Sequence, residues 1–275
     1  MRDVRPAAVS GSWYPGSEAQ LEAAVDAHLA AVAPAPGRPC PRALIAPHAG
    51  LVYSGPVAAY AYALVRGCRY SAAVLVGPSH YVSFRGVSIW PRGAWESPFG
   101  NVQVAQELAL GIVARSRDVT EHPAAHGREH SLEMQLPFIA RVLPRVPIVP
   151  LVMGYQDRAT AMGFGDALAG AVKAHSDGEV LLVASSDLSH YEDADTASKL
   201  DSVVLGCVEK LNAEALMDAL EREPRHACGG GPMVSVLHAA AQLGCTQSRV
   251  LCYADSGDVS GDKSAVVGYM AAAIW

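Results

Sequence analysis

Three short apolar segments of the sequence each run into a polar loop that carries a histidine. They are residues 42–46 (RALIA) before His48, residues 72–76 (AAVLV) before His80, and residues 179–184 (EVLLVA) before His190. Unbroken apolar runs of this length are typical of strands buried on both faces of a parallel sheet. Because parallel strands place their carboxyl ends on one edge, where open α/β sheets bind ligands, we predict that these histidines meet there.

A cysteine, Cys228, stands in the segment ACGGGP (227–232) ahead of an expected helix. Three glycines followed by Pro232 are typical of a tight turn at a helix start, where free N–H groups and the helix dipole favour an anion. A cysteine in this position is expected to have a lowered pKa, and its thiolate could attack as a nucleophile or bind a metal ion.

These residues support two kinds of chemistry. His48, His80 and Cys228 would form a three-ligand face with open positions, and imidazole nitrogen with thiolate sulfur suits Fe(II), Zn or Cu. Alternatively, Cys228 with His190 and Asp187 would form a Cys-His-Asp triad. Both interpretations remain open at the level of the residues.

A second histidine-rich segment covers residues 122–137 (HPAAHGREHSLEMQLP). His122 and His126 lie among Gly and Pro residues, so we expect them in a solvent-exposed loop. From Glu129 onwards the apolar spacing predicts a helix, which would place His130 in its first turn. Trp13 and Tyr14, in the turn-rich segment 10–16, are expected either to pack over a core edge or to form a pocket wall.

The length and composition indicate a single folded unit. The chain has 275 residues, of which 51% are hydrophobic and 17% charged, and it shows no linker or internal repeat. Apolar strands alternate with helical patterns, for example over residues 17–32, 159–173 and 198–210. We therefore predict one α/β domain, residues 1–275, with a largely parallel central sheet flanked by helices.

Charge and cysteine usage exclude several classes of function. The net charge is -6 without a cluster of Lys or Arg, which argues against nucleic acid or a membrane as a partner. No apolar run approaches the roughly 18 residues of a spanning helix, and the first residues lack a signal-peptide pattern, so a cytoplasmic location is expected. The six cysteines show no CxxC spacing, so neither a zinc ribbon nor a disulfide framework is predicted, and the thiols are expected to be reduced.

Several ordered motifs resemble those of one family. They are PHAG from residue 47, GPSH from 77, EHSLEMQLPF from 129, SSDLSHY from 185, ACGGGP from 227 and DSGDVSGDKSAVVGY from 255. Together with SGSWYP from residue 10, they make the chain similar to the Memo family, and most similar to its prokaryotic branch, the AmmeMemoRadiSam system protein B. The likeness runs from about residue 6 to the end.

The resemblance implies a fold like that of class III extradiol ring-cleavage dioxygenases. Those enzymes bind Fe(II) with two His and one carboxylate, and in the Memo pattern a cysteine replaces the carboxylate. Carried over to this sequence, the metal ligands would be His48, His80 and Cys228. Asp187 and His190 would line the same pocket, with His130 near it. The system's name also implies two protein partners, a radical SAM protein and a protein with an AMMECR domain.

We therefore expect a non-haem metal redox protein with dioxygenase-like O2 chemistry on a small organic substrate. Fe(II) is the first choice of cofactor, with Cu or Zn as alternatives. His190, positioned by Asp187, would be the acid/base group, because a catalytic histidine usually needs an orienting partner. The alternatives are a metal- or peptide-binding adaptor without turnover, and a Cys-dependent hydrolase.

Overall fold

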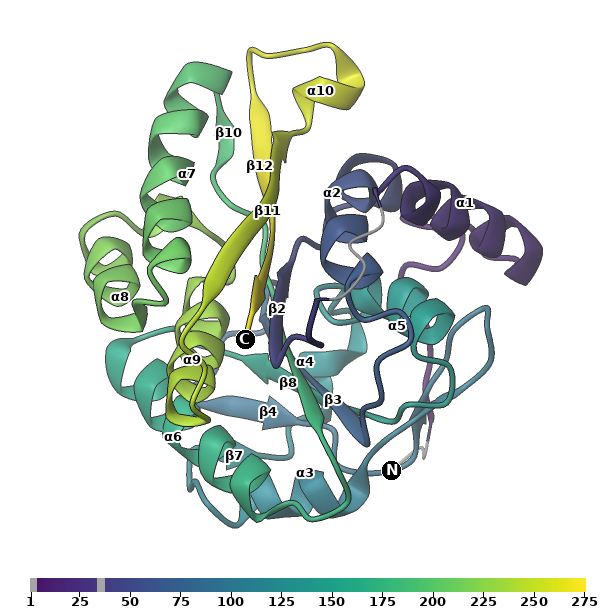
Figure 1. Ribbon diagram of the computed structural model, residues 1–275, viewed down its shortest axis with the longest axis vertical. Helices are drawn as coiled ribbons and strands as arrows, with labels where there is room; N and C mark the ends of the chain where they lie inside the picture. Colours follow the sequence, from purple (N-terminus) through teal and green to yellow (C-terminus); the bar gives the residue numbers. More distant parts are fainter. Residues whose placement is uncertain (1–3, 34–37) are drawn as a thin grey trace.

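A nine-stranded sheet runs through the centre of the protein, as a computed structural model describes it for residues 4–33 and 38–275 (Figure 1). Its middle consists of four adjacent parallel strands: β2 (Ala43–Ala46), β9 (Val180–Ser185), β3 (Ala72–Pro78) and β8 (Ile148–Met153). All residues of these strands are buried. The predicted parallel strands therefore exist, and they are neighbours.

The strands next to this parallel centre on both sides are antiparallel to it, so the prediction of a largely parallel sheet is wrong and the sheet is mixed. On one side β12 (Val266–Ile274) pairs antiparallel with β2, and β11 (Ser248–Asp255) and β10 (His190–Glu192) pair antiparallel with β12. On the other side β4 (Val87–Ile89) is antiparallel to β8 and parallel to β7 (Val119–Thr120). Burial on both faces gives the same apolar run in either direction, so hydrophobicity alone does not reveal strand orientation.

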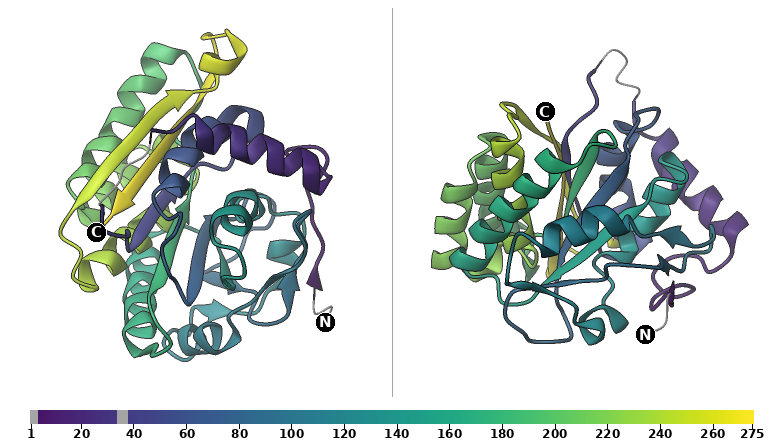
Figure 2. Two further views of the ribbon diagram at one scale, coloured as in Figure 1. Left: turned by 45° about the vertical axis from the view of Figure 1, so that its right-hand side comes forward. Right: turned by 90° about the horizontal axis from the view of Figure 1, so that it is seen from below.

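Helices cover both faces of the sheet (Figure 2). One layer contains α1 (Glu18–Ala30), α2 (Leu51–Ala63) and α5 (Leu136–Val142); the other contains α3 (Gln106–Val113), α6 (Arg158–Ala174), α7 (Ala194–Glu209), α8 (Ala213–Arg222) and α9 (Gly230–Gln242). Alternate residues of β3 serve the two layers, because successive side chains of a strand point to opposite faces. Ala73 and Leu75 pack in the first core, while Val74 and Val76 pack in the second.

A small three-stranded sheet, β1 (Val4–Arg5), β5 (Ala94–Trp95) and β6 (Val102–Gln103), holds the amino-terminal segment. Arg5 is buried, forms an ion pair with Glu133 and lies 4.3 Å from the centre of the Trp95 ring. Its side chain also donates a hydrogen bond to the carbonyl of His126, 3.0 Å away. Short helices α4 (Pro123–Gly127) and α10 (Gly257–Ser260) and the 3-10 turns η1 (Glu133–Gln135) and η2 (Pro224–His226) complete the fold.

His126 is fully buried, so its expected place in an exposed loop is wrong. The residue lies in α4, and its Nε2 is 2.9 Å from the Ser88 hydroxyl. The ring packs edge-on against Trp90 and Trp95. This burial lowers the pKa of His126 to about 3, with the nearby Arg5 charge acting in the same direction.

Cys40 and Cys68 form a disulfide, with Cα atoms 5.9 Å apart, contrary to the expectation of reduced thiols. The bond links the segment before β2 to the segment before β3. The two cysteines are 28 residues apart, and the α2 crossover between the parallel strands brings them together, which no short spacing could reveal. Among the described residues, no helix has the length and apolar character needed to cross a membrane.

Candidate metal centre

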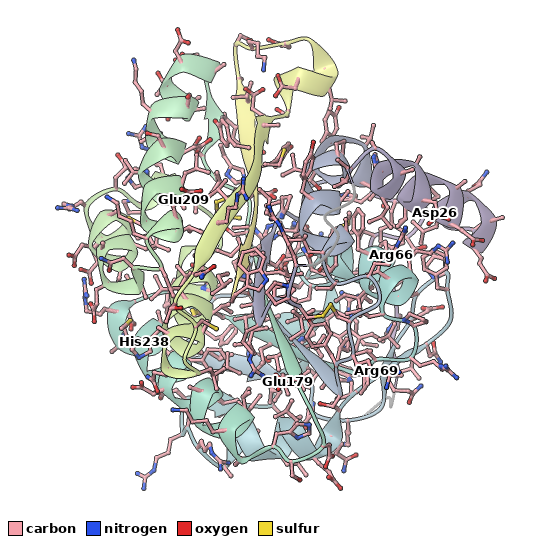
Figure 3. The ribbon with its side chains drawn as sticks, viewed as in Figure 1. Asp26, Arg66, Arg69, Glu179, Glu209 and His238 are labelled. Carbon is pink, nitrogen blue, oxygen red and sulfur yellow. A yellow bond between two sulfur atoms is a disulfide. The ribbon has the colours of Figure 1, made fainter. Side chains whose placement is uncertain are left out.

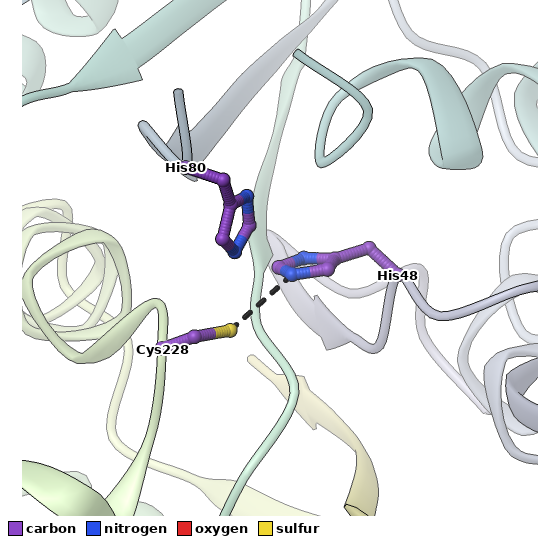
Figure 4. A group of neighbouring side chains, drawn as sticks. All are labelled: His48, His80 and Cys228. Atoms are coloured by element: carbon purple, nitrogen blue, oxygen red, sulfur yellow. Dashed lines mark hydrogen bonds between the residues drawn. The ribbon is translucent and has the colours of Figure 1, made fainter. Parts of the chain in front are cut away.

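Two histidines and a cysteine meet at the carboxyl ends of the central strands (Figure 4). His48 follows β2, His80 follows β3, and Cys228 precedes α9. Their potential ligand atoms all lie within 4.8 Å of one another, and the His48 and His80 ring centres are 5.2 Å apart. Two ligand atoms bound to the same ion by bonds of about 2.0–2.3 Å can lie up to about 4.6 Å apart, which is close to this separation. Of the three histidines predicted to meet, His48 and His80 are confirmed to converge, whereas His190, at the start of β10, is not in this group of described residues.

His48 is buried and held at both its backbone and its ring. Its backbone N–H donates to Asp187 Oδ1 at 2.6 Å, and its Nδ1 lies 2.9 Å from Ser185 Oγ. Its Nε2 faces Cys228 Sγ at 3.2 Å. Burial, followed by the proximity of His80, holds the pKa of His48 well below its usual value, so the ring is neutral and able to bind a cation.

Glu129 holds His80, and it is a site residue absent from the predictions made from the sequence. Its carboxylate accepts a hydrogen bond from the backbone N–H of His80 at 2.6 Å and faces the ring nitrogen Nδ1 of His80 at 2.8 Å. It also accepts the backbone N–H groups of His130 and Ser131, both at 2.9 Å. Burial opposes ionisation, but these hydrogen bonds outweigh it and lower the pKa of Glu129 to about 2. Because an ionised carboxylate only accepts, His80 carries its proton on Nδ1 and leaves Nε2 free for a metal ion.

His130 lies beside this pair, as the resemblance implied. Its ring stacks on His80 with centres 4.5 Å apart and lies 4.3 Å from the ring of Trp13, which therefore forms a wall of the site. Burial, followed by the proximity of His48, lowers the pKa of His130 to about 3. The predicted helix from Glu129 is wrong: the turn η1 starts at Glu133 and α5 at Leu136, and the Glu129 carboxylate binds backbone N–H groups of its own loop.

Asp187 and His190 lie beside the cluster, but their arrangement differs from the prediction. His190 Nδ1 donates to the carbonyl of Leu188 at 2.7 Å, so a backbone carbonyl, and not Asp187, orients this ring. The Asp187 carboxylate instead receives the backbone N–H of His48. Burial raises the pKa of Asp187 to about 6.

The surroundings of Cys228 contradict the expected lowered pKa. The N–H groups at the start of α9 already have acceptors, because Gly229 donates to Ser186 Oγ at 3.0 Å and Gly231 to Gln156 Oε1 at 2.7 Å. Burial, followed by the charge of Asp187, raises the pKa of the Cys228 thiol. The sulfur contacts His48, and this environment does not favour the nucleophilic thiolate that a Cys-dependent hydrolase requires.

The glycines after Cys228 permit a close approach to the sheet. A Cβ on Gly229 would lie 2.5 Å from the Ser185 carbonyl oxygen, and one on Gly231 would lie 2.6 Å from Met153 Sδ. Only glycine allows the start of α9 to pack this tightly on the ends of β9 and β8. This packing carries Cys228 towards His48.

The donor set fits a transition-metal ion. His80 presents an Nε2 lone pair, His48 directs Nε2 at the sulfur, and Cys228 supplies that sulfur. His80, Glu129 and His130 form a second group of potential ligand atoms within 4.8 Å. Since the Glu129 oxygens already receive hydrogen bonds from His80, His130 and Ser131, the first group offers the more available donors.

Comparison with known proteins identifies relatives over nearly the whole chain. The family model described as "Memo-like protein" matches residues 5–273. A "MEMO1 family protein" of Thermotoga maritima is 39% identical over 86% of this chain and 83% of its own length. One from Methanosarcina mazei is 40% identical over 82% of this chain and 83% of its own, and one from Sulfurisphaera tokodaii is 32% identical over 97% and 98%.

A solved structure shares the fold. The uncharacterized protein JW3007 of Escherichia coli K12 superposes with a TM-score of 0.58 at 17% sequence identity, covering 83% of this chain and 98% of that one. At this level of identity the likeness concerns the arrangement of strands and helices alone.

Proposed function

The chain belongs to the Memo-like protein family, and from this premise we propose that it is a non-haem metal redox protein. His48, His80 and Cys228 would hold the ion, with Fe(II) as the first choice and Cu or Zn as alternatives. The observation that carries the proposal is the grouping of these three donors within 4.8 Å. Glu129, which fixes the His80 ring, gives it further support.

The proposed reaction is dioxygenase-like O2 chemistry on a small organic substrate. An Fe(II) ion held in this site would supply the redox chemistry with O2. His190 would exchange a proton with the substrate at Nε2, since its Nδ1 proton is engaged by the Leu188 carbonyl. His130 and Trp13 would form the wall of the substrate site next to His80.

Metal analysis tests this proposal. The wild-type chain and the His48→Ala, His80→Ala and His238→Ala variants are purified with and without oxygen, and their Fe, Cu and Zn contents are measured. His238 (labelled in Figure 3) is the control because it lies on α9, is hydrogen-bonded to Asp166 and does not belong to the group of His48, His80 and Cys228. We expect about one ion per chain, retained in His238→Ala and lost from both other variants while they stay folded. Wild-type protein without stoichiometric metal after anaerobic purification would refute the proposal.

A peptide-binding adaptor without turnover is the second candidate, favoured by exposed tyrosines next to the site. Tyr81 directly follows His80 and is 47% exposed, and Tyr191 directly follows His190 and is 78% exposed. Tyrosine is enriched in protein-binding surfaces. Metal-free protein that retains its fold would favour this candidate.

The family resemblance alone leads us to propose a radical SAM protein and an AMMECR-domain protein as partners. Co-purification with a tagged copy of the chain from its native cells tests this, and repeated absence of both proteins would reject it.

A further inference from the structure

A chain of buried polar side chains lies directly behind His48. The Tyr62 hydroxyl of α2 donates to Gln135 Oε1 at 2.8 Å, and Gln135 Nε2 donates to Ser185 Oγ at 2.8 Å. Ser185 Oγ in turn lies 2.9 Å from His48 Nδ1. All four residues are at most 1% exposed, so their hydrogen bonds must be satisfied within the protein.

The Ser185 hydroxyl determines which nitrogen of His48 carries the proton. This hydroxyl has one hydrogen and two lone pairs. The carbonyl of Ser131, 2.6 Å away, can only accept, so it takes the hydrogen. The two remaining neighbours, Gln135 Nε2 and His48 Nδ1, must then both donate to Ser185 Oγ.

A second contact fixes the orientation of the Gln135 amide. Gln135 Nε2 also lies 3.0 Å from the carbonyl oxygen of Pro47, which can only accept. Rotating the amide by 180° would place two carbonyl oxygens against each other and remove the donor to Ser185. Gln135 therefore acts on the residue before His48 and, through Ser185, on the His48 ring.

We propose that Ser185 and Gln135 are positioning residues that hold His48 as the tautomer protonated on Nδ1. The Nε2 lone pair then faces Cys228 Sγ before any ion arrives. His80 is held in the same way at Nδ1, but by a carboxylate, that of Glu129, instead of a hydroxyl. The tautomer follows from this chain's own contacts, and only the effect on metal affinity rests on the proposed function.

The tautomer is measured in metal-free protein by nitrogen NMR of selectively labelled histidine, with His48→Gln used to assign the signals. We expect the His48 signals of a ring protonated on Nδ1. Because Ser88 contacts His126 and not His48, we expect the Ser88→Ala control to leave those signals unchanged. A wild-type ring protonated on Nε2 would overturn the inference.

The positioning role is measured by anaerobic Fe(II) titration of Ser185→Ala, Gln135→Met and the control Ser88→Ala. Loss of such an outer partner typically weakens metal binding 10–100-fold, and we expect about this loss in the first two variants only. Ser185→Thr, which keeps the hydroxyl, should restore most of the affinity, whereas a folding defect would not respond to the hydroxyl.

Wild-type affinity in both Ser185→Ala and Gln135→Met would overturn the positioning role. A wild-type chain that binds no Fe(II) but shows the Nδ1 tautomer would refute the proposed function while supporting the inferred tautomer. The two ideas can therefore fail separately.

Discussion

Two buried glutamates, Glu129 and Glu133, are four residues apart in sequence. Both are at most 1% exposed, yet their surroundings differ. Glu133 is paired with the guanidinium of Arg5, and it also accepts hydrogen bonds from Ala8, Val9 and Tyr14. The carboxylate of Glu129 instead accepts from the ring and backbone of His80 and from the N–H groups of His130 and Ser131, while Arg5 reaches only the Glu129 backbone carbonyl.

This difference separates a structural cluster, formed by Arg5 with Glu133, His126 and Trp95, from a binding site. Arg5 is permanently charged, so the negative charge of Glu133 is balanced within the protein. Glu129 is held by uncharged backbone donors and an imidazole, and its His80 partner keeps a lone pair directed at His48 and Cys228. A cation could therefore be accommodated beside Glu129, whereas Arg5 already occupies that role beside Glu133.

The largest expected effect tests the structural cluster. Arg5→Ala leaves Glu133 buried without its cation, so we expect the free energy of unfolding to fall by about 3–5 kcal/mol in urea denaturation. The control is Arg141→Ala, which breaks a partly exposed pair with Asp26 and should cost about 1 kcal/mol or less. A loss for Arg5→Ala no greater than that for Arg141→Ala would remove the distinction between the two glutamates.

The pH dependence of stability gives the next effect, through His126 of the structural cluster. Its pKa is about 3 in the folded chain against 6.5 as its ordinary value. Between these values the unfolded chain binds a proton that the folded chain does not, so acidification lowers stability. His126→Phe should reduce the slope of unfolding free energy between about pH 6 and 4 by about 1.4 kcal/mol per pH unit. Equal slopes in wild type and variant would show that His126 titrates normally.

Much of the site geometry could be predicted from local patterns. The runs before His48 and His80 end at Pro47 and at Gly77-Pro78, so each strand and the position of its histidine follow from residues adjacent in sequence. That the loops after β2 and β3 lie on one edge follows because parallel strands end on the same edge of a sheet, whereas the order of β2, β9 and β3 within the sheet was not predicted.

The missed features depend on contacts between distant residues. Glu129 is 49 positions from His80, and Arg5 is 128 positions from Glu133. Nothing in either local sequence specifies the partner, because the two members of each pair are far apart in sequence and meet only in the folded chain. The Cys228 thiol was misjudged for a related reason: Ser186 and Gln156, distant in sequence, occupy the N–H groups that were expected to be free.

A smaller effect tests the other glutamate. Glu129→Gln replaces one acceptor oxygen with an N–H₂ group that faces other donors, so the His80 ring loses its fixed orientation. We expect Fe(II) to bind about 10–100-fold more weakly, measured by anaerobic titration. Glu22→Gln, in a surface pair with Arg141, is the control and should bind as the wild type does. Unchanged affinity in Glu129→Gln would mean that Glu129 is as structural as Glu133.

The smallest effect concerns a single proton at Cys228. Burial keeps this thiol protonated in the metal-free chain, whereas a metal ligand must be the thiolate. Loading with Fe(II) at neutral pH should therefore release about one proton per ion, measured by calorimetry in two buffers that differ in ionisation enthalpy. His48 would contribute no proton, because burial keeps its ring neutral in the metal-free chain. Cys228→Ser should bind more weakly and release about one proton fewer per ion than the wild type, while Cys207→Ser, at a thiol outside the cluster, should match the wild type. Binding without proton release in the wild type would contradict ligation by the Cys228 thiolate and reduce the centre to its two histidines.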